Sequence, residues 1–152
     1  MGLKEVLQHD LTEAIRSRDE LKSGTIRMVL TAITNEEVSG KEARTLTEAE
    51  IITVLSREAK KRREAAEAFA DGGRADRAER EKQEGEVITT YLPAQLSEEE
   101  IAQIIKDAIA ESGASGPAGM GQVMKIVQPK IAGKADGGTV SALVKAALTG
   151  GN

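Results

Sequence analysis

The stretch from Thr47 to Gly73, TEAEIITVLSREAKKRREAAEAFADGG, decides the fold class because it carries the complete pattern of one long amphipathic helix. Thr47 with Glu50 forms a capping box, in which two side chains begin a helix by bonding free backbone N–H groups. Apolar residues then recur at helical spacing, and Gly72-Gly73 ends the helix. One face of this helix carries Ile51, Ile52, Leu55, Ala59, Ala66, Phe69 and Ala70.

Helical spacing continues on both sides of this stretch, and no segment alternates apolar and polar residues as a half-buried strand does. Before it we predict one helix ending near Arg18 and another ending at Gly40, with Ser23-Gly24 loosening the link between them. After it we predict a helix from about 75 to 91 and three more. The first of these three opens with a second capping box, Ser97 and Glu100. The other two cover about 120–131, limited by Pro129 and Gly133, and about 136–148. The fold class is therefore all-α, with about seven helices.

The segment LPAQLSEEE at 92–100 marks a boundary between two lobes. We expect residues 1–96 to form a four-helix lobe with two long helices, and residues 97–152 a small three-helix lobe. Charge is distributed unevenly between them. Residues 1–96 hold 16 basic and 19 acidic side chains, whereas residues 113–152 hold four lysines against one acid. The end of the second lobe is therefore locally positive in a chain whose net charge is −4.

Composition excludes several kinds of site. The 152 residues include no cysteine, one histidine (His9) and 1% aromatics. These numbers exclude thiolate metal centres, cysteine nucleophiles and RNA-binding modules that stack bases on rings. We expect no metal, no cofactor and no catalytic residue. Because we find neither a signal peptide nor an apolar run long enough for a membrane span, we expect a soluble cytoplasmic protein.

Arg62 stands apart from the basic run around it, which we interpret as a solvated, salt-bridged face of the helix. It falls inside the apolar stripe, where a charge needs a partner. On the next helix Glu81 and Glu84 flank the stripe that contains Gly85. We predict a structural ion pair between Arg62 and one of these acids, with Gly85 allowing close approach of the two helices. The alternative is an acid/base pair in a cleft.

The segment GKADGGTVSALVK at 133–145 carries the most specific local pattern. Asp136 can cap the following helix, and Gly137-Gly138 leaves the backbone amides of the first turn uncovered. Such a helix start favours an anion such as phosphate, and lysines precede it. The alternative is an ordinary capped helix start.

Four motifs in order resemble the GatB/YqeY family over about residues 3–149, in particular its stand-alone YqeY-like type. They are TIRMVLTAITNEEV at 25–38, SREAKKRREAAEAF at 56–69, YLPAQLSEEEI at 91–101 and MGQVMKIVQPKIAGKADGGTVSALVK at 120–145. The same module is the C-terminal part of the B subunit of the glutamine-dependent aspartyl/glutamyl-tRNA amidotransferase. The resemblance implies a tRNA-recognition appendage, and Gly138 departs from it because the family usually has a basic or polar residue there. The candidate nucleic-acid-binding residues are Lys125, Lys130, Lys134, Asp136, Gly137, Gly138, Ser141 and Lys145.

The resemblance therefore implies a tRNA-recognition or amidotransferase-associated accessory module, with tRNA, the amidotransferase or other translation-related proteins as partners. It also implies a family label of carbon–nitrogen ligase activity with glutamine as amide donor. The residues do not support that activity in this chain alone, because we find no cysteine nucleophile, no serine relay and no phosphate cradle. The alternative function is a protein-interaction adaptor with no RNA role.

Overall fold

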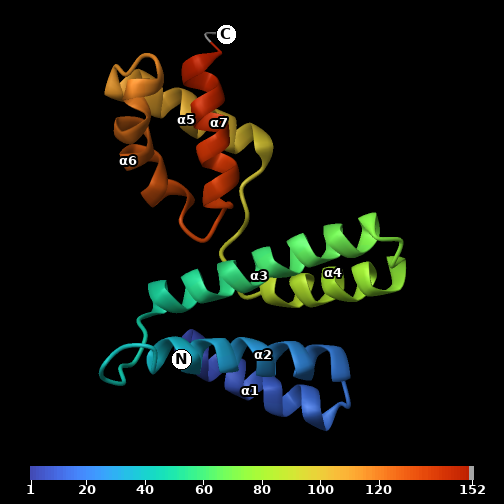
Figure 1. The fold of residues 1–152 in the computed structure, drawn as a ribbon. Coiled ribbons are helices and arrows are strands. Elements are labelled where there is room, and N and C mark those ends of the chain that lie inside the picture. The colour runs from blue at the N-terminus through green and yellow to red at the C-terminus, as the bar shows by residue number, and fades with distance from the viewer. Residues whose placement is uncertain (151–152) are drawn as a thin grey trace. The chain divides into compact units, whose positions relative to one another are not determined.

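The computed structural model describes residues 1–150, and within them it confirms the all-α expectation (Figure 1). Seven α-helices and one short 3-10 turn, η1, make up the regular structure of this range. Their bounds are α1 Leu3–Arg16, α2 Glu20–Glu37, α3 Glu48–Asp71, α4 Ala75–Thr89, α5 Glu98–Ser112, η1 Pro117–Gly119, α6 Met120–Ile131 and α7 Gly137–Thr149. Within residues 1–150, no helix is both long and apolar enough to cross a lipid bilayer.

The predicted helix starts are confirmed by their hydrogen bonds. The Thr47 hydroxyl accepts from the backbone N–H of Glu50 at 3.2 Å, and the Glu50 carboxylate accepts from the N–H of Thr47 at 3.2 Å. Ser97 and Glu100 make the same reciprocal pair, each bond at 3.1 Å. Both boxes supply partners for N–H groups that the helix itself leaves free.

Two predicted helix limits are wrong. Ser23-Gly24 lies inside α2, because the Asp19 carboxylate caps the helix earlier by accepting from the Lys22 N–H at 3.0 Å. The break falls instead at Arg18, whose φ of 59° places it in the left-handed region. Helix α2 also ends before Gly40. Helix α6 covers the predicted range, with Pro129 inside its last turn.

The chain divides into two compact units, the first from Met1 to Leu92 and the second beginning at Pro93. Sequence reasoning placed the boundary after residue 96. Leu96 packs against the apolar cluster of the second unit, which accounts for the earlier division in the structure.

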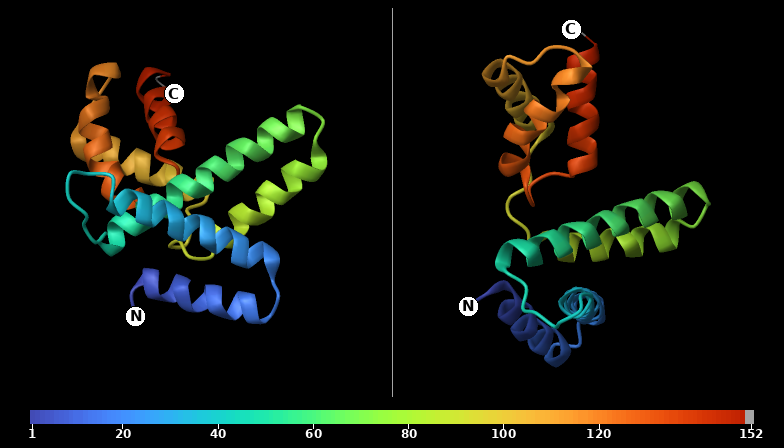
Figure 2. Two further views of the ribbon diagram at one scale, coloured as in Figure 1. Left: turned by 60° about the horizontal axis from the view of Figure 1, so that its bottom comes forward. Right: turned by 60° about the vertical axis from the view of Figure 1, so that its left-hand side comes forward.

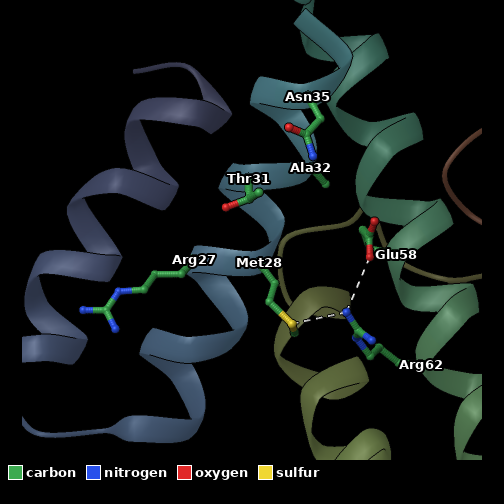
Figure 3. Close-up of a pocket in the computed structure, with 7 residues that line it drawn as sticks. All are labelled: Arg27, Met28, Thr31, Ala32, Asn35, Glu58 and Arg62. Atoms are coloured by element: carbon green, nitrogen blue, oxygen red, sulfur yellow. Dashed lines mark hydrogen bonds and ion pairs between the residues drawn. The ribbon is translucent and has the colours of Figure 1, made fainter. Parts of the chain in front are cut away.

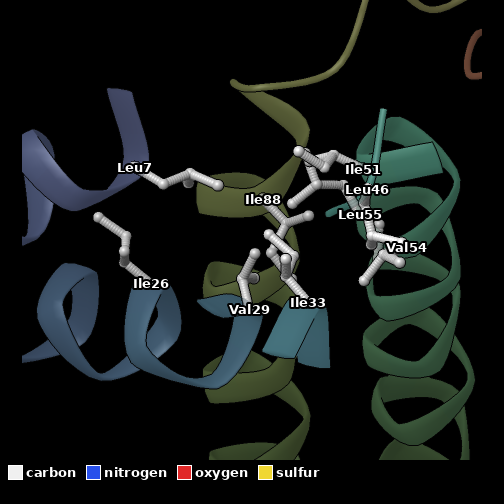
Figure 4. Close-up of a cluster of buried hydrophobic side chains, with 10 residues drawn as sticks. Leu7, Ile26, Val29, Ile33, Leu46, Ile51, Val54, Leu55 and Ile88 are labelled. Atoms are coloured by element: carbon white, nitrogen blue, oxygen red, sulfur yellow. The ribbon is translucent and has the colours of Figure 1, made fainter. Parts of the chain in front are cut away.

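The first unit consists of two antiparallel helix pairs, α1 with α2 and α3 with α4 (Figures 1 and 2). Its core is aliphatic and draws on all four helices and on the loop before α3 (Figure 4). The buried members of this cluster are Leu7, Ile26, Val29, Ile33, Leu46, Ile51, Val54, Leu55, Ala59 and Ile88.

Besides the bonds from the N–H of Leu3 to the Glu48 carboxylate, two side-chain contacts hold α1 against the rest of the first unit. Lys4 Nζ lies 2.8 Å from Glu37 Oε1, and the N–H of Leu46 donates to the other oxygen of that carboxylate at 3.2 Å. The bond from Lys4, together with that from Leu46, lowers the pKa of Glu37. At the other contact the Tyr91 hydroxyl donates to Asp10 Oδ2 at 2.6 Å, and burial raises the pKa of Tyr91 above its ordinary value.

The second unit is a three-helix arrangement of α5, α6 and α7 with its own aliphatic core. The core contains no aromatic ring, so its packing depends on branched aliphatic side chains that interdigitate closely. Its buried members are Ile101, Ile105, Ala108, Val123, Val127, Ile131, Val140, Val144 and Leu148.

Candidate nucleic-acid interface

The turn between α6 and α7 brings the central candidate residues together. Helix α6 ends at Ile131, and Gly133 turns the chain with a φ of 72°. The N–H groups of Lys134 and Ala135 both donate to the carbonyl of Ile131, at 2.7 and 3.1 Å. Helix α7 then begins at Gly137. The end of α6, the turn and the start of α7 thus carry Lys130, Lys134, Asp136, Gly137 and Gly138.

This turn is held in place by the segment that enters the second unit. Gln95 Nε2 donates to the carbonyl of Gly133 at 2.9 Å and to that of Pro93 at 2.7 Å. The N–H of Leu96 donates to the carbonyl of Lys134 at 2.9 Å. Sequence reasoning missed these positioning residues, because nothing in either local pattern shows that two segments so far apart along the chain are neighbours.

The four candidate lysines are all exposed. No ion pair or hydrogen bond joins the side chain of any of them to another residue of 1–150. The structure does not gather them at one point. Lys125 lies about 8 Å before Lys130 along α6, and Lys145 lies about 12 Å beyond the start of α7, at 1.5 Å per residue. Lys130 and Lys134 therefore form the compact part of the surface.

The start of α7 is already capped by a carboxylate. Asp136 Oδ2 accepts from the backbone N–H of Thr139 at 3.0 Å and from its hydroxyl at 2.7 Å. Gly137 and Gly138 are exposed, whereas Ser141 is partly buried. A phosphate approaching this helix end would therefore meet free amides together with the negative charge of Asp136. The positive charge that attracts a phosphate to this surface therefore comes mainly from the lysines and not from the helix start.

The predicted partners of Arg62 lie around it in the first unit. Arg62 forms ion pairs at 3.6 Å with Glu81 and Glu84 of α4 and with Glu58 one turn earlier on α3. A Cβ added at Gly85 would lie 3.4 Å from Arg62 Cβ, so the two helices approach closely at this glycine. Sequence reasoning assigned Glu58 to i,i+4 pairs of the basic run but did not name it as a partner of Arg62, which lies one turn away.

A shallow concavity of about 340 Å³ opens beside Arg62, between α2 and α3 (Figure 3). Met28 reaches from α2 toward the guanidinium, and its sulfur accepts from Arg62 Nη2 at 3.4 Å. Arg27 also lines the concavity, and its side chain is directed away from Arg62. Arg62 Nε and Glu81 Oε2 are buried and have no hydrogen-bond partner among the described residues. The guanidinium is thus surrounded by charge but held at no short distance by any carboxylate.

The model of the family described as "Yqey-like protein" matches residues 4–148, which is nearly the whole chain. The chain belongs to the Yqey-like family. The matched range extends over both units and contains the four motifs described above.

Similar Yqey-like relatives are fungal proteins named "Altered inheritance of mitochondria protein 41, mitochondrial". The relative from Lachancea thermotolerans is 33% identical over 73% of this chain and 60% of its own length. That from Candida glabrata is 35% identical over 57% of this chain and 47% of its own length. That from Pyrenophora tritici-repentis is 29% identical over 85% of this chain and 71% of its own length. The chain spans about half the length of the first two relatives.

These names correct the expectation of a cytoplasmic protein, because the similar relatives are named as mitochondrial. That expectation rested on two missing features, a secretory signal and an apolar span. Neither feature distinguishes one aqueous compartment of a cell from another, so the inference was too strong.

Proposed function

We propose that this Yqey-like chain is an accessory module that recognises tRNA through the lysines of its second unit. The observation that supports the proposal best is the set of four exposed lysines that form no ion pair within residues 1–150, Lys125, Lys130, Lys134 and Lys145. A single acid, Asp136, accompanies them in the last part of the chain. Unpaired ammonium groups contact phosphates and release the counterions that surround nucleic acid.

The kind of recognition follows from what the second unit contains. It has no aromatic side chain on which a base could stack, so it would contact the backbone and the shape of a folded RNA. The resemblance of the motifs to the C-terminal module of the amidotransferase B subunit supports tRNA as that RNA. In this proposal the chain supplies recognition, and any chemistry belongs to a partner.

The first prediction concerns Lys130 and Lys134. We expect Lys130→Glu/Lys134→Glu to weaken tRNA binding at least about tenfold at low salt, since both phosphate contacts become repulsive. The slope of log affinity against log salt should become shallower by about 2, one for each lost contact. Fluorescence anisotropy with labelled tRNA at low and physiological salt measures both quantities.

The matched control for this experiment is Lys41→Glu/Lys106→Glu. It changes the net charge equally at two other exposed lysines, one in each unit. An equal loss in both double variants would mean that only the overall charge matters. No binding of the wild type to any tRNA, even at low salt, would overturn the proposed function.

The second prediction concerns the carboxylate at the start of α7. Asn caps helices about as well as Asp, so Asp136→Asn keeps the bond to Thr139 while it removes the negative charge. We expect tRNA binding to strengthen about threefold at low salt, because a negative charge that repels phosphate is lost. The control is Glu111→Gln, which removes an exposed acid at the end of α5. Equal affinities of wild type and Asp136→Asn would show that this helix end does not face phosphate.

A protein-interaction adaptor is the second candidate, and one observation favours it. Leu143 is 44% exposed on α7, and its neighbours Ala142, Ala146 and Ala147 are exposed as well. The outer side of this helix is thus largely apolar, as at surfaces that contact another protein. In that case the chain would bind no RNA at any salt concentration, which the anisotropy experiment measures directly.

A further inference from the structure

Met28 is placed unlike the other methionines of the chain. It is 37% exposed on α2 and lines the open concavity between α2 and α3. Its sulfur lies 3.4 Å from Nη2 of Arg62 on α3, and Figure 3 shows the side chain reaching toward that guanidinium. A small water-soluble reagent can therefore approach the sulfur while a cation lies on its other side.

Arg62 has unused capacity to donate hydrogen bonds. Each of its three carboxylate neighbours lies 3.6 Å away, and its Nε has no hydrogen-bond partner among the described residues. The thioether of Met28 is a weak acceptor. A stronger acceptor on the same side chain would find a charged donor already directed at it.

We propose that Met28 is a site of reversible oxidation by hydrogen peroxide, and that Arg62 holds the resulting sulfoxide as a hydrogen-bond acceptor between α2 and α3. The sulfur gives an electron pair to one peroxide oxygen, and the O–O bond breaks. The departing hydroxide takes the proton from the transferred oxygen and leaves as water. Sulfur loses two electrons and peroxide gains them. Methionine sulfoxide is reduced again by methionine sulfoxide reductases.

Access and geometry are compatible with this step. The sulfur has a second lone pair besides the one that accepts from Arg62, and the concavity gives peroxide room to approach it. Rotation about the flexible bonds of the side chain then turns the new oxygen toward the guanidinium. The sulfoxide therefore gains a bond that the thioether makes only weakly.

The other methionines provide the contrast within the same chain. Met120 and Met124 pack against the aliphatic core of the second unit, where a sulfoxide oxygen would replace apolar contacts. Met1 is 91% exposed, so it can be oxidised, but its oxidation should not change the stability of the fold. Oxidation at Met28 should thus be both fast and harmless to the fold, a combination that neither core-packing methionine shares.

The test treats the full chain with limited hydrogen peroxide and follows each methionine by peptide mass spectrometry and thermal unfolding. We expect Met28 to be oxidised well before Met120 and Met124. We expect the unfolding midpoint of the first unit to stay unchanged or rise by up to about 4 °C at that stage. The opposite order of oxidation, or a fall in the midpoint as Met28 sulfoxide forms, would overturn the proposal.

Two variants separate the role of the acceptor from general effects of peroxide. Met28→Leu keeps the size of the side chain but removes the acceptor, so its midpoint should not respond to limited peroxide. Met28→Gln carries an amide oxygen at a similar reach and should match the oxidised wild type. A midpoint of Met28→Gln below that of Met28→Leu would show that Arg62 does not accept a polar oxygen there.

Discussion

Replacing Arg62 with methionine is expected to lower the free energy of unfolding of the first unit by about 3 kcal/mol, because three carboxylates lose their shared cation. The Arg62 side chain is 18% exposed, and the carboxylates are 12–18% exposed. Water therefore screens them incompletely. We place the effect at the lower end of the range for buried pairs because some solvent still reaches the cluster.

Urea unfolding followed by far-ultraviolet circular dichroism measures this effect. Arg63→Met is the matched control, because Arg63 is the exposed neighbour in the same helix, and it should change stability by less than about 0.5 kcal/mol. Adding Glu81→Gln to Arg62→Met should restore part of the loss, since it removes a buried unpaired charge. If the Arg62 variant is as stable as the Arg63 variant, the cluster has no structural role.

Replacing Leu55 with alanine should cost the first unit about 3–4 kcal/mol through the lost burial and the cavity that remains. Leu55 has 0% exposure and lies in the aliphatic cluster of the first unit (Figure 4). Short turns join α1 to α2 and α3 to α4, and the Glu37 contacts tie α1 and the loop before α3 to α2, so the site can collapse only partly.

Ile15→Ala provides the comparison for Leu55→Ala, because Ile15 is 49% exposed on α1. This substitution should lower the free energy of unfolding by less than about 1 kcal/mol. The second unit has its own core and serves as an internal reference within each measurement. A Leu55→Ala variant that lowers the stability of both units equally would mean that the chain unfolds as a single cooperative body.

The helix starts could be predicted from the sequence because each depends on neighbours along the chain. The boxes at Thr47 and Ser97 and the cap at Asp136 need only a side chain and an N–H group a few residues away. The start of α2 was missed for a related reason. The Ser23-Gly24 pair was interpreted as a break between two helices, whereas the Asp19 carboxylate caps the helix four residues earlier.

Contacts between distant segments were predictable only where a strong physical conflict pointed to them. A charge inside an apolar stripe demanded a partner, and the neighbouring helix offered Glu81 and Glu84 near Arg62. Met28 posed no such conflict, because a methionine in a helix suggests core packing. The bonds from Gln95 and Leu96 to the turn before α7 are also invisible to local patterns.

In the candidate interface, the sequence shows which residue types are present but not what surrounds their side chains. The excess of lysine over acid after residue 113 is a property of the sequence alone. The structure was needed to show that the candidate lysines have no ion-pair partner within residues 1–150, and that Thr139 donates to the Asp136 cap from its hydroxyl as well as from its backbone N–H. The cap itself matters for the proposal, because the Asp136 carboxylate lies at the helix start where an anion was expected to bind.

The hydrogen bond between Tyr91 and Asp10 has a consequence for spectroscopy. Tyr91 is the single tyrosine, the chain has no tryptophan, and the single phenylalanine, Phe69, also belongs to the first unit. Intrinsic fluorescence therefore reports on one half of the molecule, at the point where α1 contacts the end of α4. The second unit, which carries the four candidate lysines, has no tyrosine or tryptophan. Its unfolding, or its binding of a ligand, therefore produces no direct tyrosine signal. A single tyrosine introduced into α5 would give each half its own optical probe.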